Sequence, residues 1–409
     1  MDGDRERVEA ALLAAVRTRD AYLTELASHL IVAGGKRLRP VMTMAAAQVG
    51  GKAKVSDEVI QGAIACELVH LGSLYHDDVM DESTMRRGVD TVNAKWGNLQ
   101  AIVAGDFLLA RASGIAASLG NEIAGLLART IAELCEGQIE ELQHTYSVAR
   151  TVPSYLVSIE GKTASLFATS ARIGALVAGH DADVVDALTN YGTAFGMVFQ
   201  IVDDILDITS SDAELGKPAG HDMVEGVYTL PVLHTMAVGD ATGKELKSML
   251  GAPLDDAQQR RALEIVRAGS GIQFAIETAQ RFVQEASDAC DALPQGEVAD
   301  ALTQLLGSVE DFMAHTKIDN VLGRLNNVLG EVQNIANMIN FCAQPVDPIA
   351  IPNMLERTMG SYLGAGKQLA NEIGSMQPGN IGGCLSTDGG FNTNVFNGGV
   401  LGRISNRIQ

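Results

Sequence analysis

Three closely spaced aspartates, Asp77, Asp78 and Asp81, occur in the segment HDDVMDESTMRRG. On a helix, positions i and i+4 lie one turn apart on the same face, so Asp77 and Asp81 would project side by side. Adjacent carboxylates repel one another unless a cation lies between them. Hard oxygen ligands suit Mg²⁺, which also binds the phosphate groups of substrates. The spacing therefore predicts a Mg²⁺ site, although a solvated acidic face is the alternative.

The same spacing recurs in FQIVDDILDI, with Asp203, Asp204 and Asp207. Both triplets lie between apolar residues, whereas a solvated acidic face would have more polar neighbours. The repetition in apolar surroundings favours metal binding over a solvated face, and it makes all six aspartates candidate ligands and catalytic residues.

Basic residues accompany the triplets although the chain is acidic, with 30 basic and 50 acidic residues and a net charge of −20. This excess argues against a nucleic-acid partner, but a small phosphorylated substrate needs only a local basic pocket. A diphosphate bridged by Mg²⁺ and held by Arg and Lys fits the pattern, although ordinary ion pairing could explain each residue singly. The segment GGKRLRP lacks the spacing of a P-loop, which disfavours an ATPase or kinase. The basic residues concerned are Lys36, Arg37, Arg39, Arg86, Arg87, Lys162 and Lys217.

The elements that position these residues are expected to be helices. No proline occurs between Pro40 and Pro153, and this stretch is rich in the helix formers Ala, Leu, Glu and Met. Apolar residues recur at steps of three and four from Ile60 to Leu71, where Glu67 is the one polar member of the stripe. We therefore predict an all-α fold. Breaks between helices are expected near Gly34–Gly35, Gly50–Gly51, Gly88, Gly120, Pro153, Gly179 and Pro218.

Together these segments resemble the trans-isoprenyl diphosphate synthases, or polyprenyl synthetases, of the long-chain bacterial type. The resemblance covers about residues 20–316 and includes GGKRLRP, DDVMD with its trailing RRG, AGDFLL, EGKTA, FQIVDDILD and GKPAGHD. It implies an antiparallel helical bundle around a central cavity and a homodimer. It also implies head-to-tail condensation of isopentenyl diphosphate onto an allylic diphosphate.

The resemblance also implies a role for each matching residue. The six aspartates would hold three Mg²⁺ ions around the allylic diphosphate, and Arg86 and Lys217 would contact it. Lys162, Thr163 and Gln200 would line that diphosphate and its departing charge, with Lys162 and Lys217 counted as catalytic. For His70 a packed core residue is the alternative, but its place in the motif favours binding. The resemblance assigns isopentenyl diphosphate to Lys36, Arg39, His70 and Arg87.

The length of the product should depend on the floor of the cavity. Gly72 and Ser73 precede Asp77 by about one turn, and both are small. In the family that the chain resembles, bulky aromatic residues at these positions shorten the product. Their absence predicts products of thirty carbons or more, such as quinone side chains, although Gly72 could instead serve close helix packing.

Residues 317–409 differ in composition from the rest of the chain. They hold six basic and six acidic residues, and thirteen asparagines against four in residues 1–316. We expect an appended segment whose amphipathic helix either docks on its own body or self-associates as a coil. We expect this segment either to serve as a docking or assembly module or to take no part in the chemistry. Its expected parts are the amphipathic helix 317–343, a Pro-rich linker 344–352, a weak helix 353–376 and a Gly/Asn-rich end 377–409.

We expect the protein to be cytoplasmic. The five cysteines form no CxxC pair, the N-terminus is charged, and no uninterrupted apolar run approaches a membrane span, so no stable membrane anchor is expected.

The leading hypothesis is a long-chain synthase. A geranylgeranyl-length synthase, a terpene cyclase and a non-catalytic partner subunit or scaffold acting through residues 317–409 are the alternatives. A cyclase is disfavoured because a second DDxxD replaces its usual NSE/DTE motif.

Overall fold

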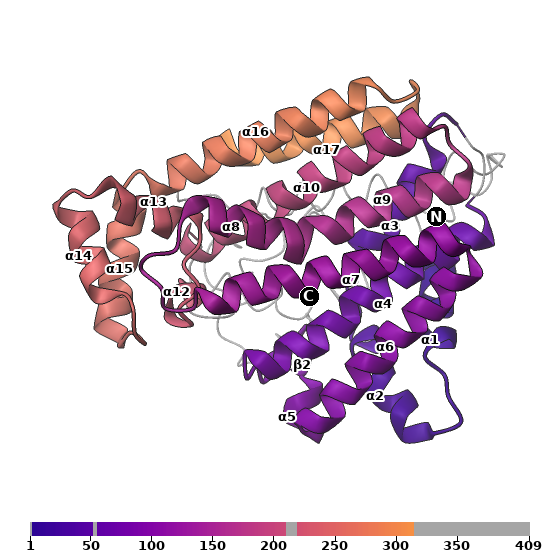
Figure 1. Cartoon of the computed structure of the whole chain (residues 1–409), viewed down its shortest axis with the longest axis horizontal. Coiled ribbons are helices and arrows are strands. Elements are labelled where there is room, and N and C mark those ends of the chain that lie inside the picture. Colours follow the sequence, from indigo (N-terminus) through magenta and orange to yellow (C-terminus); the bar gives the residue numbers. More distant parts are fainter. Residues whose placement is uncertain (1, 52–54, 210–218, 315–409) are drawn as a thin grey trace, which may run out of the picture. The chain divides into compact units, whose positions relative to one another are not determined.

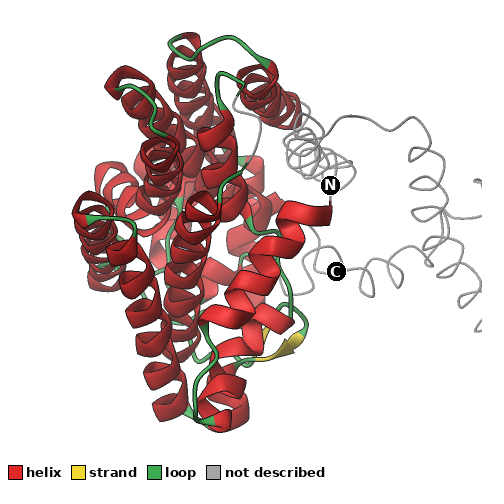
Figure 2. Ribbon diagram, turned by 90° about the vertical axis from the view of Figure 1, so that its right-hand side faces the viewer, coloured by secondary structure: helices red, strands yellow, loops and turns green. Residues whose placement is uncertain are grey.

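A computed structural model describes residues 2–51, 55–209 and 219–314, and these fold almost entirely as helices (Figures 1 and 2). The predicted all-α fold is confirmed. Lys217, the expected break at Pro218 and the whole of residues 317–409 lie outside the described residues. The helices are α1 Asp2–Ala15, α2 Ala21–Val32, α3 Leu38–Gln48, α4 Asp57–Met80, α5 Val92–Trp96, α6 Asn98–Ser118, α7 Asn121–Gln143, α8 Val152–Ile159, the π-helical turn η1 Glu160–Ala164, α9 Ser165–Ala178, α10 Ala182–Thr209, α12 His221–Val224, α13 Leu230–Val238, α14 Ala241–Met249, α15 Asp256–Ala268, α16 Gly271–Asp291 and α17 Glu297–Ala314.

The helix breaks follow the glycines and prolines of the sequence. Gly34 and Gly35 lie between α2 and α3, Gly120 lies between α6 and α7, and Gly179 ends α9 in a left-handed conformation. Pro153 occupies the first turn of α8, where a missing amide hydrogen does no harm. Gly50 and Gly51, both with positive φ, follow the end of α3. Five of the expected breaks therefore coincide with real helix ends, and Gly88 marks a different kind of turn.

The continuous segment formed by η1 and α9 packs against several other helices. It contacts α3, α4, α7 and α10. Helix α4 also packs along α6, and α10 packs along α16, which runs beside α17 (Figure 1). The two aspartate triplets lie at the C-terminal ends of the long helices α4 and α10.

The RRG sequence after the first triplet forms a small hairpin (Figure 2). Strand β1, Met85–Arg86, pairs antiparallel with β2, Val89–Asp90, so Arg87 and Gly88 form a two-residue loop. Both loop residues have positive φ, 55° for Arg87 and 75° for Gly88, as a type I′ turn requires. The turn separates the side chains of the two arginines, which go to different partners.

Helix α6 has an apolar exposed face. Among the described residues it is the one helix that is long and apolar enough to cross a membrane by length and composition, and 33% of its apolar window is buried. Buried helices of soluble proteins pass the same test. Leu99, Ile102 and Val103 on this helix are 77%, 40% and 58% exposed.

Candidate active site

The central aspartate of the first triplet is anchored in the protein. Asp78 is 1% exposed, and its Oδ1 accepts a hydrogen bond from Arg86 Nε at 2.6 Å. The amide of Asn93 donates to the backbone oxygen of Asp78 at 2.9 Å, which ties α4 to α5. The hairpin thus returns Arg86 to the triplet. In this structure Arg86, expected at the diphosphate, pairs with a carboxylate beside it.

The other two aspartates of this triplet lie near Lys162. Desolvation raises the pKa of Asp77, while the positive charge of Lys162 opposes the rise. Desolvation also raises the pKa of Asp81 to about 6, opposed by Lys162 and reinforced by the negative charge of Asp77. Lys162 Nζ donates to Glu141 Oε1 at 2.6 Å, so α7 holds the ammonium group beside the triplet. A cation between the two carboxylates would relieve their repulsion.

The central aspartate of the second triplet is anchored in the same way. Asp204 is 3% exposed and accepts hydrogen bonds at both oxygens, from Tyr155 Oη at 2.5 Å and from Gln200 Nε2 at 2.9 Å. Thr163 Oγ1 donates in turn to Gln200 Oε1 at 2.8 Å. Two residues expected to line the diphosphate, Thr163 and Gln200, therefore form one chain of hydrogen bonds to the second triplet.

The turn η1 connects the two triplets. Its Lys162 attracts Asp77 and Asp81, and the adjacent Thr163 reaches the second triplet through Gln200. A π-helical turn inside a longer helical segment is often found at functional sites. Gly137 of α7 lies so close to this turn that an added Cβ would come within 2.5 Å of the backbone nitrogen of Lys162.

The remaining aspartates border the same region. Asp203 is exposed and attracts Lys36, so the GGKRLRP loop lies near the second triplet. Asp207 is 6% exposed and its Oδ2 accepts the backbone N–H of Asp222 at 3.4 Å. Both triplets thus have basic residues as neighbours.

The donor set suits Mg²⁺ bound together with a phosphate. Within residues 2–51, 55–209 and 219–314, no three acidic, His or Cys side chains converge on one point that could hold a metal ion. Mg²⁺ commonly takes only one or two carboxylates and completes its coordination with water and substrate phosphate. Desolvation and neighbouring negative charge raise the pKa values of Asp77 and Asp81, and a cation bound beside these carboxylates would offset both effects. The aspartates present therefore fit the ion.

The residues expected to bind isopentenyl diphosphate form a second, basic cluster. Desolvation lowers the pKa of His70 well below its usual value, and the nearby charges of Arg39, Arg87, Arg86 and Arg37 lower it further. The guanidinium of Arg39 lies over the ring of Phe167, 4.5 Å from its centroid. A neutral His among arginines suits an anion with several negative charges.

The two residues expected at the cavity floor, Gly72 and Ser73, have different surroundings. A Cβ on Gly72 would lie 3.1 Å from the backbone oxygen of Gly105 and 3.2 Å from the side chain of Leu109, so Gly72 allows α4 to approach α6 closely. Ser73 is half-buried, and its hydroxyl donates to the backbone oxygen of His70 at 2.9 Å. The close packing at Gly72 is the alternative to a role in the cavity floor that the sequence left open. Ser73 is therefore the better residue at which to test whether this region forms the floor of the cavity.

Three residues in this region were missed as site residues. Tyr155 had no spacing signal beyond lying seven residues before Lys162. Arg37 was noted only as part of the basic loop, but it is 3% exposed and bonded to carboxylates of α1 and α4. Glu67 was visible as the one polar residue of an apolar stripe, and this signal could have identified it.

The described helices adopt the all-α isoprenoid synthase fold. A family model described as polyprenyl synthetase matches residues 20–267. The nonaprenyl diphosphate synthase of Mycobacterium tuberculosis is 39% identical over 70% of this chain and 86% of its own length. Component 2 of the heptaprenyl diphosphate synthase of Geobacillus stearothermophilus is 39% identical over 75% of this chain and 94% of its own. The chain therefore belongs to the polyprenyl synthetase family.

Solved structures agree with this assignment. A polyprenyl synthase from Caulobacter crescentus CB15, complexed with calcium and isoprenyl diphosphate, is 34% identical with a TM-score of 0.70, over 76% of this chain and 94% of that chain. A geranylgeranyl pyrophosphate synthase from Corynebacterium glutamicum, also complexed with calcium and isoprenyl diphosphate, is 38% identical with a TM-score of 0.68, over 76% of this chain and 95% of that chain. A polyprenyl synthase and a geranylgeranyl pyrophosphate synthase thus share this fold.

Proposed function

We propose that the protein is a Mg²⁺-dependent prenyltransferase that condenses isopentenyl diphosphate head-to-tail onto an allylic diphosphate. The product would be a long-chain all-trans polyprenyl diphosphate of the kind used as a quinone side chain. The observation that carries the proposal is the pair of aspartate triplets bordering η1. The long-chain relatives favour this product over a geranylgeranyl-length one.

The residues divide into two binding groups. Asp77, Asp81, Asp203 and Asp207 would hold three Mg²⁺ ions, with Asp78 and Asp204 supporting them. Bound Mg²⁺ would supply positive charge that stabilises the diphosphate as it leaves. The ammonium of Lys162, held by Glu141 at 2.6 Å, would contribute further positive charge there. Lys36, Arg39, His70 and Arg87 would hold isopentenyl diphosphate.

The reaction then needs no nucleophile from the enzyme. Cleavage of the allylic C–O bond leaves an allylic cation, and the double bond of isopentenyl diphosphate attacks it to form the new C–C bond. A proton is lost to the departed diphosphate, which restores a neutral double bond. Water would quench the cation, so the chain must exclude it from the cavity.

A homodimer fits the exposed face of α6. Leu99, Ile102 and Val103 present apolar side chains to solvent on one helix, and a second copy of the chain would cover them. Replacing Val103 by Glu should convert the dimer to monomers in sedimentation experiments. An unchanged sedimentation coefficient would place the dimer contact elsewhere.

The decisive experiment incubates the full-length protein with Mg²⁺, isopentenyl diphosphate and farnesyl diphosphate and sizes the products. We expect a ladder that ends at a defined length of thirty carbons or more. A product that stops at twenty carbons would support the shorter-chain alternative. If the folded protein forms no product, the proposed prenyltransferase activity would be refuted, and a role as a partner subunit or scaffold would be favoured.

A further inference from the structure

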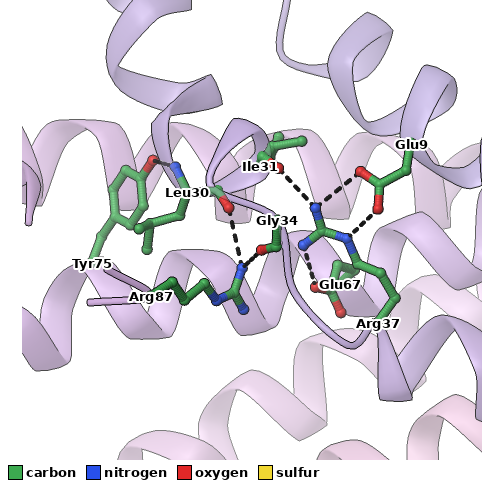
Figure 3. A network of polar contacts seen from close by, with 8 residues as sticks. All are labelled: Glu9, Leu30, Ile31, Gly34, Arg37, Glu67, Tyr75 and Arg87. Atoms are coloured by element: carbon green, nitrogen blue, oxygen red, sulfur yellow. Dashed lines mark hydrogen bonds and ion pairs between the residues drawn. The ribbon is translucent and has the colours of Figure 1, made fainter. Parts of the chain in front are cut away.

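Glu67 is a buried carboxylate within the basic cluster. It is 1% exposed and precedes His70 on α4 by about one helical turn. Its Oε1 accepts a hydrogen bond from Arg37 Nη1 at 3.0 Å (Figure 3). Its Oε2 is buried, and no described residue donates a hydrogen bond to it. A buried carboxylate with an unfilled acceptor destabilises a fold, so its presence requires an explanation.

The partner of Glu67, Arg37, is held from several directions. Its Nε and Nη2 donate to the two oxygens of Glu9 at 2.8 and 3.0 Å, and Nη2 also donates to the backbone oxygen of Ile31 at 2.9 Å (Figure 3). Arg37 has a φ of 54°, a left-handed conformation that is uncommon for residues other than glycine. It directly follows Lys36 and lies two residues before Arg39. The contacts that hold Arg37 in place therefore also hold the backbone of the GGKRLRP loop, which carries Lys36 and Arg39.

Glu67 also attracts two other arginines directly. Desolvation lowers the pKa of Arg39 to about 10, and the negative charge of Glu67 opposes this change. Desolvation likewise lowers the pKa of Arg87, again opposed by Glu67 and reinforced by the positive charge of Arg37. Arg87 is tied to the same loop, since its Nη1 donates to the backbone oxygens of Leu30, at 3.1 Å, and Gly34 (Figure 3).

The arginines are close enough to repel one another strongly. A Cβ added to Gly35 would lie 2.9 Å from Arg87 Cζ and 3.2 Å from Arg37 Nη1, so both guanidinium groups border one glycine. Like charges at such separations repel more strongly in a protein interior than in water. A single carboxylate among them offsets this repulsion.

We propose that Glu67 is a positioning residue for isopentenyl diphosphate, holding Arg37, Arg39 and Arg87 in one arrangement before the substrate enters. This inference rests on the proposed function. A carboxylate in an anion pocket repels the anion, but it also holds the arginines that bind it. We infer that the second effect dominates, so that removing the charge weakens substrate binding.

The test replaces Glu67 by Gln, which keeps the shape and an acceptor oxygen but removes the charge. The KM for isopentenyl diphosphate should rise about 10- to 100-fold, with a smaller change in kcat. The KM for farnesyl diphosphate should stay within about twofold of wild type. A KM for isopentenyl diphosphate that falls or stays constant would overturn the proposal.

The matched control is Glu9→Gln. It removes the other carboxylate bonded to Arg37, but the Glu9 side chain is 32% exposed and belongs to α1. Its KM for isopentenyl diphosphate should change by less than about threefold. An equal rise in both variants would show that Glu67 acts only by keeping Arg37 folded in place, which contradicts a direct effect on Arg39 and Arg87.

A further variant covers the case in which Glu67→Gln does not fold, as judged by circular dichroism. Glu67→Asp keeps the charge but shortens its reach, and it should raise the KM for isopentenyl diphosphate alone by a smaller factor. A parallel rise in both KM values would indicate general damage and refute the positioning role. Wild-type protein without turnover would refute the proposed function together with this inference. Wild-type turnover with unchanged KM values in the Glu67 variants would refute this inference alone.

Discussion

Replacing Gly137 by Ala should displace Lys162 without touching its side chain. The new Cβ would lie 2.5 Å from the backbone nitrogen of Lys162 and 2.7 Å from the backbone oxygen of Ser158. An ordinary contact begins near 3.4 Å, so α7 and η1 must separate by about 0.9 Å. Overpacking of this kind destabilises proteins by about 1–3 kcal/mol. A shift of about 1 Å in a group that binds the reacting diphosphate can lower turnover roughly 100-fold.

The assay combines thermal unfolding with steady-state turnover of isopentenyl and farnesyl diphosphates. We expect the melting temperature to fall by roughly 2–6 °C, given about 2 °C for each kcal/mol in a chain of this size. Gly125→Ala on the same helix is the control, because its Cβ would meet only Arg129 Nη1, at 3.4 Å. The control should keep full activity and gain up to about 1 kcal/mol from helix propensity.

A double-mutant cycle shows whether the loss acts through Lys162. In a Lys162→Gln background, Gly137→Ala should lower turnover much less than it does in the wild type, because the displaced ammonium is already absent. The reasoning is refuted if Gly137→Ala loses stability but keeps wild-type turnover. It is also refuted if the loss of turnover is the same in both backgrounds.

Four other changes, one of them with a control variant, test the remaining assignments. Asp77→Ala should keep the helical circular dichroism spectrum but lower turnover by orders of magnitude, and near-wild-type activity would contradict the metal assignment. Tyr155→Phe should lose about 1.5–3 kcal/mol of unfolding free energy and raise the Mg²⁺ concentration needed for half-maximal rate. Tyr191→Phe, which removes a buried hydroxyl bonded to a backbone oxygen at 3.1 Å, should leave that Mg²⁺ concentration unchanged, and equal shifts would contradict the role of Tyr155. Ser73→Phe should shorten the product, and an unchanged product distribution would remove this residue from the cavity floor. Deleting residues 317–409 should reduce the number of subunits if this segment assembles the enzyme, and an unchanged subunit count would exclude that role.

Much of the fold could be predicted because local signals agreed with packing. The helical period and the glycines between helices depend on neighbouring residues, so they can be recognised without a structure. The hairpin at Arg87–Gly88 was missed as a strand pair because each strand has only two residues, too few to show alternation. Gly88 was nevertheless recognised as a break, because a left-handed turn favours glycine.

The partners of the site residues could not be predicted in the same way. Tyr155 lies 49 positions before Asp204, and Arg37 lies 30 positions before Glu67. Such contacts arise from how helices cross, which one sequence does not specify. The bond between Lys162 and Glu141 is also a crossing contact, between η1 and α7. The sequence therefore indicated which residues could bind a diphosphate, but the structure was needed to see what holds them.

The geometry of the triplets explains why each has a second aspartate next to the first. Positions i and i+4 share a helix face, whereas position i+1 points about 100° away from position i. Asp78 and Asp204 occupy this position and are 1% and 3% exposed, each bonded to a side chain of another segment. An aspartate fixed in this way limits rotation of the helix end that carries its neighbours. The i+1 aspartate can therefore orient the ligands of the same triplet without being a ligand itself. Because Tyr155 holds Asp204 in this way, Tyr155→Phe should change the Mg²⁺ concentration that the reaction needs.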